Sequence, residues 1–188
     1  MRFSADTAYR VEKSFLRFGL RAIPENGMPK NTAEHFQIWA NENRGYANRQ
    51  ELLSDMFTLK GGYRYAWNMT HRVFKGPLIR NAFSLMTNSR LDRAEDAYEL
   101  FITVDQANGE QYQDILGYDY HIGLGVTGTS KISLTRFILE AKQIKNCYEK
   151  MIEYANKRHD SFLESAALDT KEKLLESVGN TLVERVSA

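Results

Sequence analysis

Residues 130–163, SKISLTRFILEAKQIKNCYEKMIEYANKRHDSFL, carry the clearest structural pattern in the chain. Apolar side chains recur there every seven residues, and a second apolar set fills the companion positions: Leu134, Ala141, Tyr148, Ala155 and Phe162, with Phe137, Ile144 and Met151. A repeat of this kind is typical of the buried seam of a helical bundle or coiled coil. The pattern predicts one long helix from Ser130 to about Leu163.

The residues after this stretch predict a second helix that folds back on the first. Asp169 or Thr170 is suited to cap it, and its apolar side runs to about Val186. We therefore expect residues 130–188 to form a C-terminal helical hairpin.

The N-terminal part, residues 1–109, reads as a series of helices. Helical spacing of apolar residues or capping signals predict five of them, over residues 4–21, 31–45, 49–59, 77–86 and 91–107. Residues 63–74 fit a strand or a helix, and we favour the helix. Residues 110–129, rich in Gly and Tyr, are expected to form a loop with one helical turn or a short strand near Tyr120. The fold class expected is all-α, a single helical domain over residues 1–188.

Composition places the chain among ordinary globular proteins. It has 188 residues, of which 43% are hydrophobic and 26% charged, and a formal net charge of +1. Cys147 is the single cysteine, so no disulfide can form within the chain. The N-terminal residues do not resemble a signal peptide, and no apolar run approaches the ~20 residues that span a bilayer. We expect a cytoplasmic protein, or part of an intracellularly assembled particle, with no membrane partner.

The near-neutral total hides a strongly basic segment, residues 56–91, whose charges sum to +6 without any acid. Its cations are Lys60, Arg64, Arg72, Lys75, Arg80 and Arg90. Tyr63, Tyr65 and Trp67 lie among them, and such rings can stack on unpaired bases. Clustered cations without acids suit phosphate contacts, so a nucleic-acid-binding protein is one reading of this segment. A solvated basic face over a core of aromatic residues is the plainer one.

The next segment, residues 92–120, is acidic and sums to −7. Asp92, Glu95, Asp96 and Glu99 recur at helical spacing, which predicts that all four carboxylates lie on one face. Such like charges repel, and an opposing basic surface would relieve the repulsion. If that surface belongs to another copy of the chain, the contact is heterologous and builds rings or filaments. A plain solvated acidic face is the alternative.

No motif for a known chemistry is convincing. Gly123, Gly125 and Gly128, followed by Ser130, match a phosphate-binding glycine loop, but the flanking strands and ribose-binding acid of a dinucleotide fold are missing. We expect a loop with a weak anion site at most. The four histidines are scattered, and no zinc or di-iron pattern occurs. We therefore expect no catalytic residues, no metal and no cofactor.

These observations favour a non-enzymatic helical protein that works through its surfaces. It would be a coat, connector or scaffold-like subunit of the viral or phage-like kind, and its partner would be a second copy or another protein. Its complementary surfaces would be residues 56–91 and 92–120. A nucleic-acid-binding protein and an enzyme with an unrecognised site remain the alternatives.

Overall fold

The computed structural model describes residues 15–24, 34, 45–46, 48–58, 69–87, 91, 94–122 and 134–186. Within them it has five helices and a three-stranded mixed sheet, so the all-α prediction is wrong. The elements in chain order are β1 (Phe15–Pro24), α3 (Arg49–Phe57), β2 (Arg72–Val73), α4 (Gly76–Thr87), α5 (Glu95–Gln106), β3 (Glu110–Ile122), α6 (Leu134–Arg158) and α7 (Ser161–Val186).

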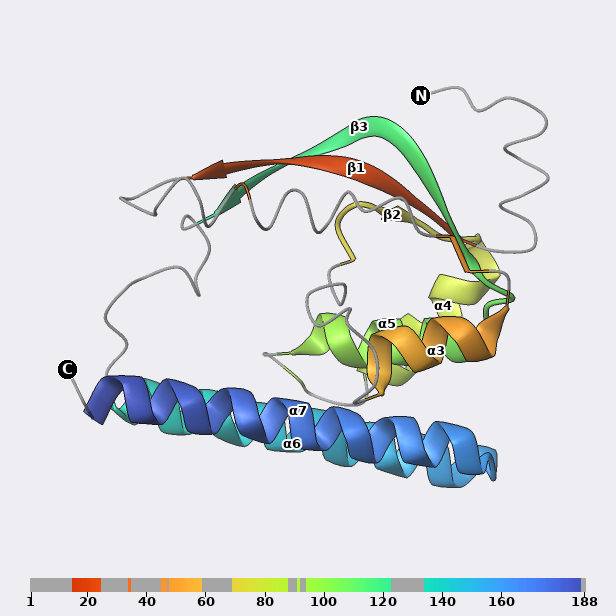
Figure 1. The fold of residues 1–188 in the computed structure, drawn as a ribbon. Coiled ribbons are helices and arrows are strands. Elements are labelled where there is room, and N and C mark those ends of the chain that lie inside the picture. The colour runs from red at the N-terminus through yellow and green to blue at the C-terminus, as the bar shows by residue number, and fades with distance from the viewer. Residues whose placement is uncertain are drawn as a thin grey trace, which may run out of the picture.

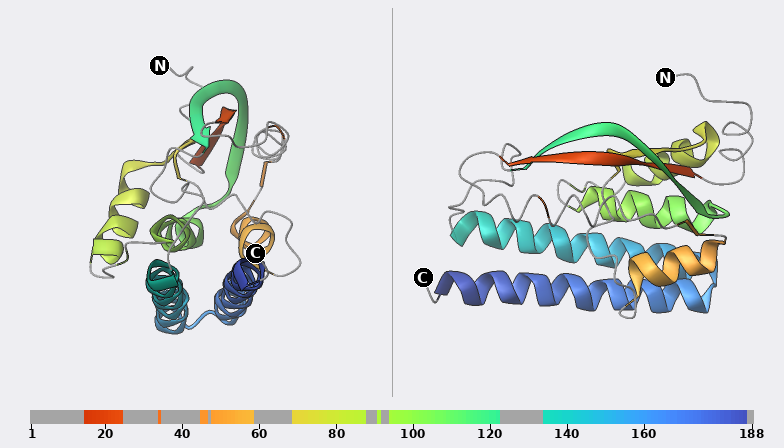
Figure 2. Two further views of the ribbon diagram at one scale, coloured as in Figure 1. Left: turned by 90° about the vertical axis from the view of Figure 1, so that its left-hand side faces the viewer. Right: turned by 45° about the horizontal axis from the view of Figure 1, so that its top comes forward.

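These elements form three layers, seen from the side in Figure 1. The curved β1–β3 ribbon lies on one side, α3, α4 and α5 occupy the middle, and the α6–α7 hairpin lies on the opposite side. Viewed end-on in Figure 2, α5 sits over α6 and α3 over α7. Contacts of α3 with α5 and of α6 with α7 complete a four-helix bundle, and α4 packs beside it against α5.

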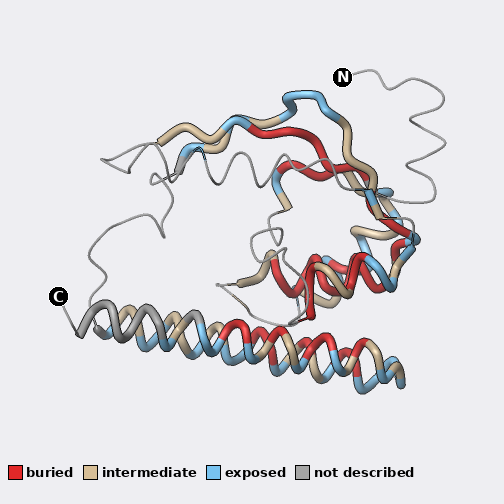
Figure 3. The backbone as a smooth tube through the Cα atoms, in the orientation of Figure 1, coloured by how far each residue is buried: buried red, intermediate tan, exposed pale blue. Residues whose placement is uncertain are grey.

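The core lies where α3 and α5 cover the hairpin. Figure 3 shows that the buried positions of α6 and α7 gather in the half nearest the turn that joins them. Phe101 of α5 is fully buried there and makes edge-to-face contacts with Phe57 of α3 and Tyr154 of α6, at 5.1 Å and 6.3 Å between ring centroids. Such pairs add to the stabilisation that burial itself provides.

A buried carboxylate, Asp105 near the end of α5, ties the same three helices together by polar contacts. It accepts hydrogen bonds from the Tyr154 hydroxyl at 2.7 Å and from the guanidiniums of Arg158, at 3.0 Å, and Arg49. Arg49 also pairs with Asp160 in the α6–α7 turn at 2.7 Å. The position of the hairpin relative to α3 and α5 is therefore set by charges as well as by the core.

The sheet has the strand order β2–β1–β3. The short β2 pairs with β1 in antiparallel fashion at Leu16 and Arg17 only, whereas β3 pairs with β1 in parallel along its whole length. Beyond Arg17 the part of the sheet that the structure describes is therefore a two-stranded parallel ribbon.

Three of the expected elements are replaced, wholly or in part, by strands. Residues 15–21, expected at the end of a helix, belong to β1. A strand places Leu16, Phe18 and Leu20 on one face and Arg17, which pairs with Glu110, on the other, and residues 16–20 are all buried. Residues 110–122, expected as a loop, form β3. The favoured helix over residues 63–74 gives way to β2 at Arg72–Val73, and its residues 63–68 lie outside the described residues.

The helix predictions over residues 49–59, 77–86 and 91–107 are confirmed by α3, α4 and α5. The long helix ends earlier than expected, at Arg158, because His159 adopts a left-handed conformation with φ 52°. Asp160 then accepts the backbone N–H of Leu163 at 3.0 Å and starts α7, so a start at residue 169 or 170 is wrong. Residues 4–14 and most of the predicted helix over residues 31–45 lie outside the described residues.

Candidate interaction site at the bulge of strand β3

A cluster of buried charges fixes the base of the ribbon. Glu110, the first residue of β3, pairs with Arg17 of β1 and, at 3.4 Å, with Arg72 of β2, and all three side chains are 0% exposed. Arg17 and Arg72 are direct cross-strand neighbours, so the shared carboxylate offsets a repulsion that would otherwise destabilise the pair. The Arg17 guanidinium also lies 4.6 Å from the centre of the Tyr112 ring.

His71 is buried beside this cluster and stays neutral. Burial and the positive charges of Arg72 and Arg17 lower the pKa of His71 to about 2. Its backbone carbonyl accepts the N–H of Phe18 at 2.8 Å, which adds a further tie between β1 and the chain entering β2. The base of the ribbon is therefore held by hydrogen bonds and by ion pairs.

One step further along the ribbon, β3 bulges away from β1. Phe18 pairs with Gln113, but the next residue of β1, Gly19, pairs with Leu116, and the one after it, Leu20, pairs with Tyr118. Asp114, Ile115 and Gly117 consequently have no partner on β1. Bulges of this kind bend a strand and redirect its side chains. In Figure 1 they coincide with the arch of β3 over β1.

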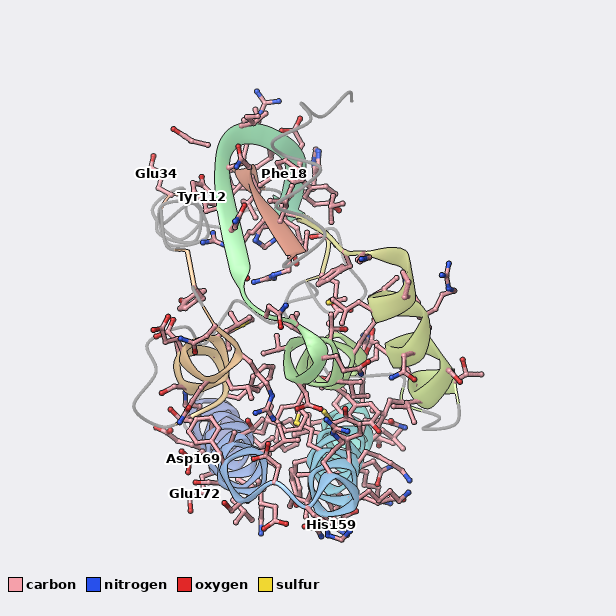
Figure 4. All side chains as sticks on the ribbon, turned by 90° about the vertical axis from the view of Figure 1, so that its right-hand side faces the viewer. Phe18, Glu34, Tyr112, His159, Asp169 and Glu172 are labelled. Atoms are coloured by element: carbon pink, nitrogen blue, oxygen red, sulfur yellow. The ribbon has the colours of Figure 1, made fainter. Side chains whose placement is uncertain are left out.

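Two glycines allow this arch to form. A Cβ on Gly117 would lie 2.9 Å from Cβ of Phe18, closer than side chains pack, and a Cβ on Gly19 would lie 3.3 Å from the carbonyl oxygen of Ile115. The two strands approach each other more closely here than any other residue type would permit without a shift. Figure 4 shows Phe18 and Tyr112 on the ribbon, far from His159 at the turn of the hairpin.

The bulge holds two large apolar side chains out in solvent. Ile115 is 50% exposed and the adjacent Leu116 is 56% exposed. Asp114 beside them is exposed as well. Asp119, the other exposed acid of the ribbon, already pairs with Arg21 across the strands at 2.6 Å, and this ion pair lowers its pKa. Asp114, Ile115 and Leu116 form what we call the bulge surface.

The basic segment divides between the interior and the surface. The Arg72 side chain is buried, pairs with Glu110 and interacts electrostatically with Asp96. It is therefore not available to bind a nucleic acid or another protein. Lys75 and Arg80 are exposed at the start of α4, and neither has an ion pair within the described part of the chain. Phe83, one turn beyond Arg80, is 48% exposed. Lys60, Arg64 and Arg90 lie outside the described residues, as do Tyr63, Tyr65 and Trp67.

The expected acidic face is only partly exposed, because Glu95 and Asp96 are half-buried and Glu99 is buried. Glu99 is only 5% exposed, and its Oε1 atom has no hydrogen-bond partner among the described residues. Burial, followed by the charges of Asp96 and Glu95, raises the pKa of Glu99 to about 7, and burial also raises the pKa of Asp96. Asp92 lies outside the described residues. Among the described acids of the 92–120 segment, Asp114 and Asp119 on the ribbon are the exposed ones, and Asp119 pairs with Arg21.

The remaining sequence features add no second site. Gly123, Gly125, Gly128 and Ser130 of the glycine loop lie outside the described residues. Within the described ranges, no three His, Cys, Asp or Glu side chains are arranged to hold a metal ion. None of the helices there is long and apolar enough to cross a membrane.

Comparisons with known proteins leave the geometry as the sole guide to function. No family model, curated protein or solved structure matches this chain.

Sequence reasoning missed Ile115, Leu116 and Phe83 as surface residues. The one available signal was Gly117 among alternating tyrosines, because an isolated glycine in a strand pattern often marks a bulge.

Replacing Gly117 by alanine tests the close approach at the bulge. The added methyl group must displace Phe18 or the β3 backbone, so we expect the free energy of unfolding to fall by about 1–3 kcal/mol. Gly179 of α7 is the matched control, because a Cβ there meets nothing within 4 Å. In that helix Gly179→Ala should raise stability by about 0.5–1 kcal/mol. Urea unfolding of both variants measures the difference, and equal effects would contradict the described packing.

The buried Glu99 predicts a pH-dependent effect of Glu99→Gln. With its pKa raised from 4.5 to about 7, the folded chain holds a proton that the unfolded chain releases, so the wild type loses stability as pH rises through this window. Relative to wild type, the glutamine variant should gain about 2–3 kcal/mol at pH 8 and nothing near pH 4.

The control for this measurement is Glu149→Gln, because Glu149 is 51% exposed and pairs with Lys145 at the surface of α6. Denaturant unfolding at both pH values gives the free energy of unfolding of each variant relative to wild type. The lowered pKa of His71 makes stability rise with pH, but this contribution is the same in all three proteins and cancels in the difference. If Glu99→Gln changes the free energy of unfolding equally at pH 4 and pH 8, burial does not raise the pKa of Glu99 and the prediction is wrong.

Proposed function

We propose that this protein is a non-enzymatic assembly subunit, of the coat, connector or scaffold kind, that binds neighbouring protein through its bulge surface. The observation that carries the proposal is the pair Ile115 and Leu116, adjacent and about half exposed on a strand whose conformation is set by Gly19, Gly117 and the buried charges at its base. Exposed apolar side chains on a fixed backbone suit protein contact, because little ordering cost remains at binding.

The setting of this pair supports the same conclusion. Parallel strands are usually covered on both faces, and a two-stranded ribbon is marginally stable by itself. The bulge instead leaves residues 114–117 exposed. Covering Ile115 and Leu116 completely would contribute about 1.5–3 kcal/mol for each side chain.

Such a contact is small, and its size indicates how the protein would work. Stable pairwise interfaces bury about 1,200–2,000 Å², far more than two side chains provide. Contacts of this size become effective when many copies act together, since each further contact is then made at a high local concentration. A repeating assembly therefore suits the bulge surface better than an isolated dimer does.

Replacing Leu116 by aspartate tests this function. A charge at the centre of the bulge surface should abolish association, whereas the same change at Leu139 should leave it intact, because Leu139 is 57% exposed on the solvent face of α6. Light scattering of the untagged protein over a series of protein and salt concentrations measures the molar mass of each variant. We expect wild type and Leu139→Asp to form oligomers and Leu116→Asp to remain monomeric.

Two results would contradict the proposal. One is a wild-type protein that stays monomeric at every concentration. The other is association that appears only with an added oligonucleotide and weakens steeply with salt, which would favour nucleic-acid binding through cations such as Lys75 and Arg80.

A further inference from the structure

We infer that the bulge surface docks on helix α4 of a second copy of this chain, at the surface formed by Lys75, Arg80 and Phe83. This inference rests on the proposed function and names the partner of the same site. It names Asp114 on the ribbon as the acid that a neighbour's cations meet, since Glu99 of the expected acidic face is buried.

The α4 surface combines positive charge with an exposed aromatic ring. Lys75 directly precedes the helix, and the Arg80 guanidinium lies against Gly76, where a Cβ would be 3.2 Å from the Arg80 Nη1 atom. Arg80 therefore reaches back toward the start of α4, where Lys75 lies. Phe83 follows three residues after Arg80 and so lies on the same side of the helix, 48% exposed.

The bulge surface is complementary to this one in both respects. It offers one carboxylate, Asp114, beside two half-exposed aliphatic side chains, Ile115 and Leu116. The Asp114 carboxylate is adjacent in the strand to this apolar pair, so charge and apolar surface lie together. Opposite charges would steer and orient the two surfaces, and Phe83 would cover the aliphatic side chains.

The two surfaces lie on different parts of one molecule. In Figures 1 and 2, α4 flanks α5 in the middle layer, while the arch of β3 stands at the outer side of the ribbon. A contact between unlike surfaces of two copies is heterologous, so it propagates into a ring or a filament. Two bulge surfaces facing each other would instead bring two Asp114 carboxylates together, which disfavours a symmetric contact.

A mixing experiment tests the pairing directly. Leu116→Asp removes the bulge surface and leaves α4 intact, whereas Phe83→Asp removes the α4 surface and leaves the bulge intact. Each variant alone should have an association constant about 10-fold or more below that of wild type. It should therefore remain monomeric at concentrations where the wild type assembles. At the highest concentrations, where each variant alone is still monomeric, an equimolar mixture should form a weak dimer of the two variants that grows no further, because it has one working contact. Sedimentation velocity resolves these species, and circular dichroism verifies that both variants are folded.

A charge exchange gives a second test that leaves the apolar side chains in place. Asp114→Lys and Arg80→Glu should each weaken association several-fold, and the two changes in one chain should restore most of it. Exposed charge pairs contribute little individually, so restoration is the informative result.

The possible outcomes separate this inference from the proposed function. If Leu116→Asp is monomeric while Phe83→Asp still assembles, the bulge surface stands and α4 is not its partner. If both variants are monomeric and the mixture does not dimerise, the two surfaces do not meet and the inference is overturned. A wild-type protein that never associates overturns both proposals.

Discussion

Three buried charges, Arg17, Arg72 and Glu110, join three strands that are distant in the sequence. A buried ion pair is not by itself strongly stabilising, because the cost of removing the charges from water offsets most of the attraction. Such a group is better suited to defining register. A shift of β1 by one residue would turn Arg17 to the other face of the sheet and leave the Glu110 carboxylate with an incomplete set of partners. The cluster thus selects one alignment of β1 with β3, and the position of the bulge depends on that alignment.

The elements that hold the fold together differ from the elements that carry the proposed contact surfaces. The four-helix bundle and the Asp105 network hold α3, α5 and the hairpin together, and α4 packs against α5. The ribbon, which lies opposite the hairpin, includes Asp114, Ile115 and Leu116, while α4 beside the bundle includes Arg80 and Phe83 and directly follows Lys75. Both proposed surfaces are therefore attached to rigid elements, as an assembly subunit requires if its contacts are to repeat with the same geometry.

The sequence allowed the helices to be predicted wherever apolar spacing and chain breaks agreed, as they do for α3, α4 and α5. The prediction was wrong where the seven-residue apolar spacing continued across a turn. Ala155 and Phe162 keep the seven-residue spacing, yet His159 and Asp160 between them reverse the chain. β1 was missed because Phe15 and Phe18 fit a helix, and because Arg17 places a charge where a buried strand would have an apolar residue. In β3 the bulges interrupt the period of two, so the alternation of tyrosines extends over too few residues to be recognised as a strand.

The candidate surfaces were harder to predict than the elements. Arg72 and Glu99 count as surface charges in any linear reading, and only the packing of β2 and α5 takes them inside. The exposure of Ile115 and Leu116 likewise depends on an approach of Gly117 to Phe18 between residues almost a hundred positions apart. Within the described ranges, the exposed members of the two charged segments that the proposals use are Lys75, Arg80 and Asp114.

Amide hydrogen–deuterium exchange of β3 at low and high protein concentration tests the central claim most directly. If the bulge surface is where copies meet, exchange of the amides of residues 114–118 slows as the concentration rises, while the amides of residues 110–113 at the base of the ribbon are unchanged. Equal exchange of residues 114–118 at all concentrations, in a sample that light scattering shows to be associated, would place the contact elsewhere on the molecule.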